Sequence, residues 1–335
     1  MAILPNPKFT DDIQRVVEVM KNGDNWLIVT HERPDGDAIG SALAIAHILE
    51  QLGKKWTFLT ETVLPRRFDY LEFFGKAQLA SHFAGERFSH VIAVDCADEM
   101  RFQGLHGWIA NQATIVNIDH HRTNPRYGMA NYVDADAAAT CELIFYLAQQ
   151  LQQPMQQSLA AALYTGILTD TAGFIQPNTT KAVHQIAAEL LAAGVQPYDI
   201  AEPALESRSA AQMHLLQMAL ANLTVSRNGL YAAIYVTRGM LDGAGANDDD
   251  VEGLVGFARS IDTVEVGMLF RETEEGTVKV SLRSKRRVDV SRVAQQFGGG
   301  GHVRAAGCVI MDTLDIAMDK VSAAIEAALA EAGLA

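Results

Sequence analysis

Three short apolar segments constrain the fold of this 335-residue chain more than any other feature. They are NWLIVT at residues 25–30, HVIAVD at 90–95 and TIVNID at 114–119. Nearly continuous apolar runs of this length are typical of strands buried on both faces, as in parallel sheets. The carboxyl ends of such strands meet at one edge of the sheet, where ligands bind in open α/β folds. The pattern therefore predicts an N-terminal parallel sheet with a binding site at that edge.

Acidic and histidine side chains gather at the ends of these predicted strands. Carboxylates crowded at one edge repel each other unless a cation lies among them. A set rich in aspartate and poor in histidine favours Mn²⁺ or Mg²⁺ over zinc. Any one fragment has a simpler interpretation, since Asp37 could cap a helix, but their joint occurrence favours a two-metal hydrolase. The residues of this set are His31, Asp35, Asp37, Asp95, Asp119, His120, His121 and, further along the chain, Asp170.

The C-terminal half carries a second candidate site in GGGGHVRAAG, residues 298–307. Four glycines in a row could form a flexible turn, but between a predicted helix and a predicted strand they can bring backbone N–H groups close to an anion. His302 and Arg304 can donate to phosphate oxygens. Arg283 alternates with apolar residues in TVKVSLR, so it can project from a strand. The predicted substrate-binding residues are Arg283, Gly299, Gly300, Gly301, His302 and Arg304.

Composition and charge argue against a protein that binds long nucleic acids or spans a membrane. The formal net charge of −13 argues against a long nucleic-acid footprint, because a polyanion would be repelled. No apolar stretch is long enough to span a bilayer, and the N-terminus lacks the pattern of a signal peptide. The three cysteines have neither disulfide-framework nor zinc spacing, which fits a reducing, cytoplasmic location.

Hydrophobic periodicity divides the chain into helices, strands and one irregular loop. The loop is expected at residues 121–140, and the first helix is expected to be capped by Thr10 or Asp11. Further strands are predicted at 55–60, 224–226, 230–238, 264–272 and 277–284. Helices are predicted at 11–22, 36–55, 137–151, 157–170, 179–194, 209–223, 248–260, 289–297 and 314–332, with a short helical segment at 64–75.

Five motifs give the chain a family resemblance. HERPDGD (31–37), VDCAD (94–98), IDHH (118–121) and LTDTAGF (168–174) resemble, in this order, the four motifs of the DHH phosphoesterases, and residues 298–307 resemble the signature of the DHH-associated C-terminal domain. Within that family the length and domain content are most similar to the nanoRNase/pAp phosphatases. The expected architecture is α/β with two domains and the active site in the cleft between them. A parallel-sheet DHH catalytic domain is expected at 1–195, a linker with a connecting helix at 196–222, and a smaller α/β substrate-binding domain at 223–335.

The resemblance also implies roles for single residues. It assigns His31, Asp35 and Asp95 to one metal ion, and Asp37, Asp95, His120 and Asp170 to a second, so that Asp95 bridges the pair. His121 is expected to contact phosphate or to donate a proton to the leaving oxygen, and Asp119 to orient a histidine ligand. Two divalent ions are the implied cofactors, Mn²⁺ first, with Mg²⁺ or Co²⁺ as alternatives.

The implied activity is hydrolysis of short oligoribonucleotides and linear dinucleotides to mononucleotides, and of 3′-phosphoadenosine 5′-phosphate (pAp) to AMP, by in-line attack of a water activated by two metals. The expected partners are these substrates and a second copy of the chain, with no membrane. The alternatives are a manganese-dependent pyrophosphatase, a single-strand exonuclease of the RecJ kind, and a non-catalytic nucleotide-binding module.

Overall fold

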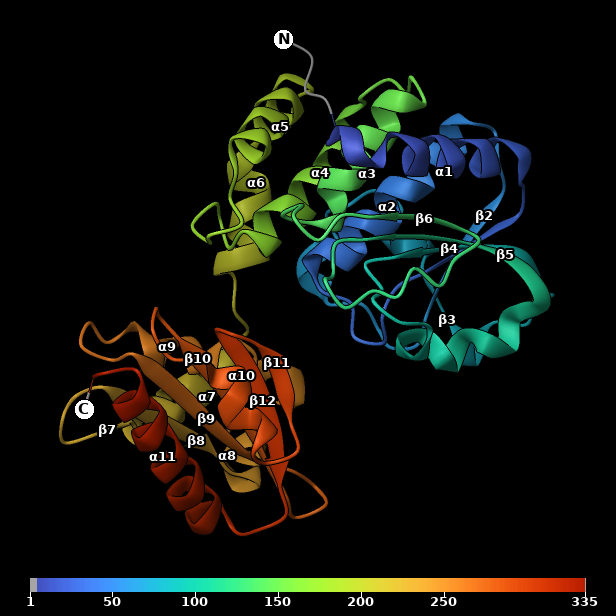
Figure 1. Ribbon diagram of the computed structural model, residues 1–335. Helices are drawn as coiled ribbons and strands as arrows, with labels where there is room; N and C mark the ends of the chain where they lie inside the picture. Colours follow the sequence, from blue (N-terminus) through green and yellow to red (C-terminus); the bar gives the residue numbers. More distant parts are fainter. Residues whose placement is uncertain (1–4, 335) are drawn as a thin grey trace. The chain divides into compact units, whose positions relative to one another are not determined.

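The computed structural model describes residues 5–334 and divides the chain into two compact units, Met1–Ser207 and Arg208–Ala335 (Figure 1). The segment 196–222, predicted as a linker with a connecting helix, is divided between them. Ile200 and Ala204 are buried in the core of the first unit, whereas Leu215 and Ala219 are buried in the second. The apolar side chains of this segment therefore belong to the two cores rather than to a free connection.

The first unit contains a six-stranded sheet in the order β3-β2-β1-β4-β5-β6, and all its pairings are parallel. The three apolar segments form its central strands, as predicted, and residues Trp26 to Val29 are completely buried. The predicted parallel sheet is confirmed. The strands are β1 (Trp26–Val29), β2 (Trp56–Thr60), β3 (Gln78–Leu79), β4 (Phe88–Val94), β5 (Ile109–Asp119) and β6 (Ala130–Val133).

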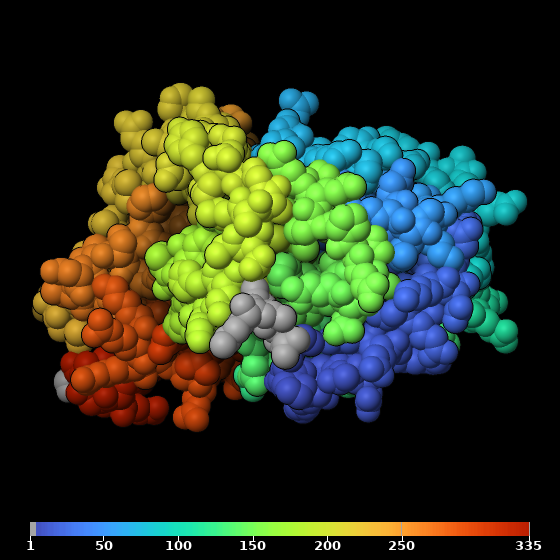
Figure 2. Space-filling model, turned by 90° about the horizontal axis from the view of Figure 1, so that it is seen from above, coloured from blue at the N-terminus to red at the C-terminus, as the bar shows by residue number. Residues whose placement is uncertain are grey.

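Alternate side chains of this sheet enter two different cores, because successive residues of a strand point to opposite faces. Ile28 packs among the long helices, whereas Leu27 and Val29 pack against Phe102 and Leu105 of the turns after β4. Figure 2 shows the yellow-green residues of α5 beside the green residues of α3 and α4, which α5 contacts. The helices are α1 (Thr10–Asn22), α2 (Gly36–Gln51), α3 (Thr140–Gln150), α4 (Gln157–Asp170), α5 (Lys181–Ala192) and α6 (Pro197–Ala201). The shorter turns are η1 (Pro7–Phe9), η2 (Arg66–Phe68), η3 (Phe74–Lys76), η4 (Ala80–His82), η5 (Glu99–Trp108) and η6 (Glu202–Glu206).

Two local predictions in this unit were wrong. The expected loop at 121–140 contains strand β6, which pairs with the end of β5 and forms one edge of the sheet. The first helix is not capped by Thr10 or Asp11: its N-cap is Phe9, and the Thr10 hydroxyl donates to the Pro7 carbonyl oxygen at 2.8 Å. The preceding turn η1 leads directly into α1, so neither side chain is needed as a cap.

The second unit is built on a mixed sheet in the order β11-β12-β10-β9-β8-β7. Among the residues that the structure describes, only β8 and β9 pair in parallel. The strands predicted at 264–272 and 277–284 are confirmed, and they form the antiparallel pair β9 and β10. The strands are β7 (Thr224–Val225), β8 (Tyr231–Val236), β9 (Val266–Glu272), β10 (Val278–Ser284), β11 (Gly300–His302) and β12 (Ala305–Ile310).

Helices cover both faces of the second sheet. Met268 and Phe270 pack on the side of the C-terminal helix, and Leu269 packs on the other side. The helix predicted at 248–260 is interrupted at Gly253, which has a left-handed φ of 82°. No helix within residues 5–334 combines the length and apolarity needed to cross a bilayer. The helices are α7 (Ala210–Ala221), α8 (Arg238–Ala244), η7 (Asp248–Val251), α9 (Leu254–Ser260), α10 (Val290–Gln295) and α11 (Leu314–Glu331).

Candidate metal centre and substrate contacts

The aspartates and histidines singled out in the sequence meet at the carboxyl edge of the first sheet. His31 follows β1, Asp95 follows β4, and His120 follows β5, so adjacent parallel strands deliver all three to one edge. Asp35 is the N-cap of α2, where its Oδ1 accepts from the backbone N–H groups of Asp37 and Ala38. The sheet and the start of α2 therefore supply most of the site.

Glycines allow α2 and α4 to approach closely enough to bring their aspartates together. A Cβ on Gly40 of α2 would lie 2.5 Å from the Ala162 carbonyl oxygen. A Cβ on Gly166 of α4 would lie 2.5 Å from Oδ1 of Asp37. Larger side chains at these positions would push the helices apart. Because Asp37 lies in the first turn of α2 and Asp170 at the end of α4, this close packing places both at the site.

The donor atoms form overlapping groups that could hold cations. His31, Asp35 and Asp95 form one group, and Asp37, His120 and Asp170 form another, each with one donor atom per residue within 4.8 Å of the others. Donors on one small divalent ion, each about 2.1 Å from it, lie roughly 3 Å apart in octahedral geometry. Nε2 of His120 lies 3.2 Å from Oδ2 of Asp170, which fits that spacing.

Asp95 lies between the two groups. Its Oδ2 is 3.6 Å from Nε2 of His31, and its Oδ1 is 3.6 Å from Nε2 of His120. Its backbone has a left-handed φ of 53°, a conformation that few residues other than glycine, asparagine and aspartate adopt readily. The backbone N–H donates to the Ile118 carbonyl oxygen at 3.0 Å, which anchors this turn to the end of β5. Asp95 therefore presents one carboxylate oxygen to each group.

The start of α3 holds two of the aspartates, a feature that the sequence did not reveal. The backbone N–H groups of Thr140 and Cys141 donate to the two oxygens of Asp37 at 2.6 and 3.0 Å. The Thr140 hydroxyl donates to Oδ1 of Asp95 at 3.0 Å. These bonds fix both carboxylates from a helix that is about 100 residues away from Asp37 and 45 residues away from Asp95 in sequence. The only local signal was a threonine at the start of a predicted helix, a common feature.

Burial makes this edge unfavourable for free carboxylates. It raises the pKa of Asp37 to about 7, with a further contribution from Asp95, and it raises the pKa values of Asp35 and Asp170. For Asp95 burial acts in the same direction, but the hydrogen bond with His31 and the neighbouring histidines outweigh it, lowering its pKa to about 2. Four acidic groups with so little water require compensating positive charge, so the donor set fits divalent cations.

The two histidines of the DHH triplet have different partners. Nδ1 of His120 lies 3.3 Å from the Ala137 carbonyl oxygen, which leaves Nε2 directed to the aspartates. Nδ1 of His121 donates to Oδ1 of Asp119 at 2.7 Å, a bond that raises the pKa of His121 against the effect of burial. Asp119 thus orients His121, and not one of the predicted histidine ligands. His121 nevertheless lies in a third donor group, with Asp95 and His120.

Asn124 is another residue that the sequence did not single out. Its Nδ2 donates to Oδ2 of Asp119 at 2.6 Å and lies 2.8 Å from Oδ1 of Asn117. Asn117 is buried in β5 and also donates to Tyr127. This network holds the carboxylate that orients His121.

The predicted substrate-binding residues of the second unit lie near one cross-strand position of its sheet, that of Ala305 in β12. Arg283 of β10 and His302 of β11 both pair with Ala305 of β12, so their side chains share one face. Arg283 is partly buried, and burial lowers its pKa, with Arg259 acting in the same direction; its Nη1 donates to the Leu282 carbonyl oxygen. His302 and Arg304 are exposed. The structure therefore brings a partly buried cation and an exposed imidazole to one end of the sheet.

The glycine run has a structural reason in addition to the proposed anion contact. A Cβ on Gly299 would lie 2.2 Å from the Gly307 carbonyl oxygen, and one on Gly301 would lie 2.5 Å from that of Ala305. Gly301 also has a φ of 139°. By contrast, a Cβ on Gly300 would meet nothing within 4 Å among the described residues. Close packing of β11 on β12 therefore accounts for two of the glycines.

Comparison with known families agrees with this architecture. Residues 25–167 match the model of the DHH family N-terminal domain, and residues 228–331 match the DHHA1 domain. A bifunctional oligoribonuclease and PAP phosphatase NrnA of Thermus thermophilus is 35% identical over 334 residues, covering 98% of each chain. The chain belongs to the DHH family. A second bifunctional oligoribonuclease and PAP phosphatase NrnA, from Bacillus subtilis, is 28% identical over 86% of this chain and 90% of its own.

Solved DHH structures show the same fold. An exopolyphosphatase-related protein from Bacteroides fragilis has a TM-score of 0.86 at 25% identity, covering 94% of this chain and 96% of its own. RecJ of Thermus thermophilus in complex with Mn²⁺ has a TM-score of 0.55 at 16% identity, covering 98% of this chain and 56% of RecJ. The latter likeness concerns the fold alone. DHH family members are metal-dependent phosphoesterases, and this chain has donor groups that could bind the metal.

We expect Thr140→Val to weaken Mn²⁺ binding by about 10–100-fold, the usual cost of losing a group that orients a metal ligand. The substitution keeps the shape of the side chain but removes the hydroxyl that donates to Asp95. Calorimetric titration of Mn²⁺ into metal-stripped chain measures the affinity. Thr140→Ser, which keeps the hydroxyl, serves as the control. Equal Mn²⁺ affinity in the valine and serine variants would show that the hydrogen bond has no such role.

Proposed function

We propose that this chain hydrolyses short oligoribonucleotides and linear dinucleotides to mononucleotides, and pAp to AMP. The observation that carries the proposal is the pair of donor groups at the carboxyl edge of the first sheet, with one oxygen of Asp95 directed to each. Family membership adds the reaction class, since DHH proteins are phosphoesterases. The full-length similarity to oligoribonucleases and PAP phosphatases adds the substrate class.

The proposed ligands divide between two divalent cations, with Mn²⁺ favoured by the excess of carboxylate oxygens. His31 and Asp35 would hold one, Asp37, His120 and Asp170 the other, and Asp95 both. Bound ions supply Lewis-acid activation of water and neutralise charge on the phosphate. The chain itself contributes fixed donor positions: α3 holds Asp37 and Asp95, and the Ala137 carbonyl oxygen sets the ring of His120.

His121 is the proposed proton donor to the leaving oxygen. It is partly exposed, so a substrate can reach it, and the hydrogen bond to Asp119 favours its protonated form by raising its pKa. That bond also fixes the orientation of the ring, while the amide of Asn124 holds Asp119 in place. A protonated imidazole beside a phosphate ester can donate to the alcohol oxygen as its bond to phosphorus breaks.

The second unit would recognise the rest of the substrate. Arg283 and Arg304 can pair with a phosphate, and His302 can donate to a phosphate oxygen. Fixing one end of a short substrate turns binding energy into orientation of the scissile bond. A homodimer and a cytoplasmic location remain predictions; the three buried free thiols are compatible with the latter.

We expect catalytic efficiency to be highest for substrates of two to about five nucleotides and to fall for longer RNA. Each added phosphodiester brings a negative charge toward a chain whose formal charge is −13. The measurement is turnover of 5′-labelled RNAs of increasing length at one salt and Mn²⁺ concentration, with pyrophosphate and pAp as parallel substrates. Efficiency that rises steadily with length would favour the RecJ-like alternative. Rapid turnover of pyrophosphate alone would favour the pyrophosphatase.

A further inference from the structure

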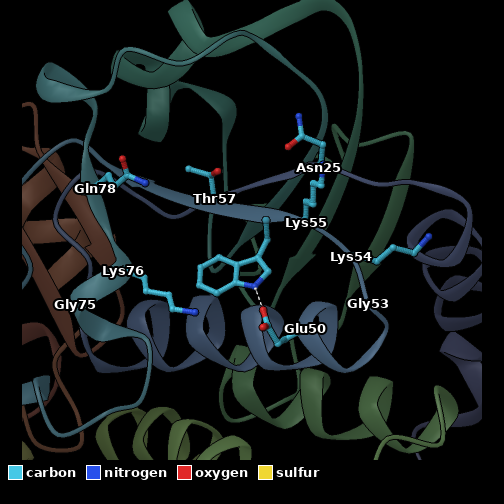
Figure 3. A pocket seen from close by; sticks show the side chains of 10 residues that line it. Asn25, Glu50, Gly53, Lys54, Lys55, Thr57, Gly75, Lys76 and Gln78 are labelled. Atoms are coloured by element: carbon cyan, nitrogen blue, oxygen red, sulfur yellow. Dashed lines mark hydrogen bonds between the residues drawn. The ribbon is translucent and has the colours of Figure 1, made fainter.

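A hollow of about 890 Å³ lies at the amino edge of the first sheet, where β1 and β2 begin (Figure 3). The candidate metal centre lies at the other ends of these parallel strands. At about 3.3 Å per residue, the five residues of β2 alone span roughly 17 Å. The hollow is therefore separate from the candidate metal centre, and the proposed reaction makes no use of it.

Positive charge is concentrated in this hollow. Lys54, Lys55 and Lys76 line it, against one acidic residue, Glu50. Figure 3 shows Lys54 and Lys76 on opposite sides of Glu50. The chain carries 40 acidic residues against 27 lysines and arginines, so an excess of lysine in one hollow is a local reversal of its overall charge. Such a reversal favours the binding of a small anion in the hollow.

The ammonium group of Lys76 is held in place before any ligand arrives, whereas that of Lys54 is held by α1 and points away from Trp56 (Figure 3). Nζ of Lys54 donates to the Lys21 carbonyl oxygen at 2.7 Å. Nζ of Lys76 lies 4.1 Å from the ring centroid of Phe73 and 5.3 Å from that of Trp56. Restraint of long side chains lowers the entropy lost when they bind an anion. A nearby carboxylate, that of Asp24, already accepts from the backbone N–H of Lys55.

The hollow also offers contacts for a planar base. The half-buried indole of Trp56 donates from Nε1 to Oε2 of Glu50 at 2.8 Å, which fixes the ring and engages the acidic residue. Asn25 and Gln78 are exposed in the lining, and their amides can both donate to and accept from the edge of a base. An aromatic ring beside lysines is a combination that binds nucleotides without selecting one base.

We propose that this hollow is a second binding site, which takes a nucleoside monophosphate, with the phosphate on the lysines and the base against Trp56. If the proposed function is correct, this ligand is also a product of the reaction. Its binding in the hollow, however, requires neither the metals nor hydrolysis. The test therefore uses metal-stripped chain, so that failure of the proposed reaction would leave it intact.

Equilibrium dialysis with AMP, inorganic phosphate and adenosine is the test. We expect Lys54→Ala/Lys55→Ala/Lys76→Ala to lose one AMP site per chain, or to bind there at least about tenfold more weakly, since each lost charged contact is a substantial part of the affinity. The control, Lys8→Ala/Lys181→Ala/Lys320→Ala, removes the same charge from exposed lysines elsewhere and should bind AMP like the wild type. AMP should bind more tightly than phosphate, and adenosine weakly.

Equal AMP binding by the two triple variants would overturn the proposal. If inorganic phosphate bound as tightly as AMP, the proposed contact with the base would be wrong. If adenosine bound as tightly as AMP, the proposed contact with the phosphate would be wrong. Thermal unfolding, followed by tryptophan fluorescence, checks that each variant is folded. If the triple variant of the hollow unfolds, Lys55→Glu provides the test, because it keeps the ring contacts of Lys76; unchanged AMP binding in that variant would also contradict the site.

Discussion

Asp95→Asn is expected to lower kcat/KM on a linear dinucleotide by more than about 100-fold, since residues that only orient metal ligands already account for about 10–100-fold. Asp95 presents one oxygen to each donor group, so its loss affects both proposed ions. Asparagine tolerates the left-handed backbone of this position and can still accept from Thr140. The fold should therefore survive. Initial rates with pApA and Mn²⁺ measure the effect.

The matched control for Asp95→Asn is Asp136→Asn. Asp136 is also an aspartate of the first unit, but its side chain is 85% exposed and it lies outside every donor group of the described residues. We expect this variant to keep the wild-type rate. Similar losses in both variants, or wild-type activity in Asp95→Asn, would contradict the bridging role.

Gly166→Ala is expected to destabilise the first unit by about 1–3 kcal/mol, the usual cost of overpacking a core. The new Cβ would lie 2.3 Å from Sγ of Cys141 and 2.5 Å from Oδ1 of Asp37. The higher helix propensity of alanine, about 1 kcal/mol, offsets only part of this. Activity should fall further than stability alone explains, because a displacement of about 1 Å at a reacting centre can cost about 100-fold.

Tryptophan fluorescence during urea unfolding isolates the first unit, because all three tryptophans, Trp26, Trp56 and Trp108, belong to it. Gly107→Ala is the control, since a Cβ there meets no described atom within 4 Å. It should change stability by no more than about 0.5 kcal/mol. If Gly166→Ala unfolds at the same urea concentration as Gly107→Ala and remains fully active, the close packing of α2 and α4 does not determine the site.

The central strands and the cluster of aspartates and histidines could be predicted because their signals are local. An apolar run followed by acidic residues is visible within one short segment, as in NWLIVTHERPDGD at 25–37. Strand β6 was missed because it has four residues and its pairing with β5 is a tertiary feature. Its surroundings, rich in asparagine, proline and glycine, predicted a loop.

Other features depend on contacts between distant segments. Thr140 donates to Asp95 across 45 residues, and its N–H donates to Asp37 across 103. In the sequence alone, Gly166 is only a residue with low helix propensity. The close approach of Asp37 and Cys141 explains why a glycine is needed there. Sequence patterns therefore show which residues can bind a metal or a phosphate better than they show which distant residues contact them.

The proposed reaction requires that the aspartates and histidines at the edge of the first sheet hold two ions at once. The most direct measurement is a titration of Mn²⁺ into metal-stripped chain, in which electron paramagnetic resonance and hydrolysis of pApA are followed in the same samples. We predict that activity appears with the second ion per chain and that the spectrum shows two Mn²⁺ ions coupled through a shared ligand. Full activity with a single uncoupled ion, or without metal, would contradict the account.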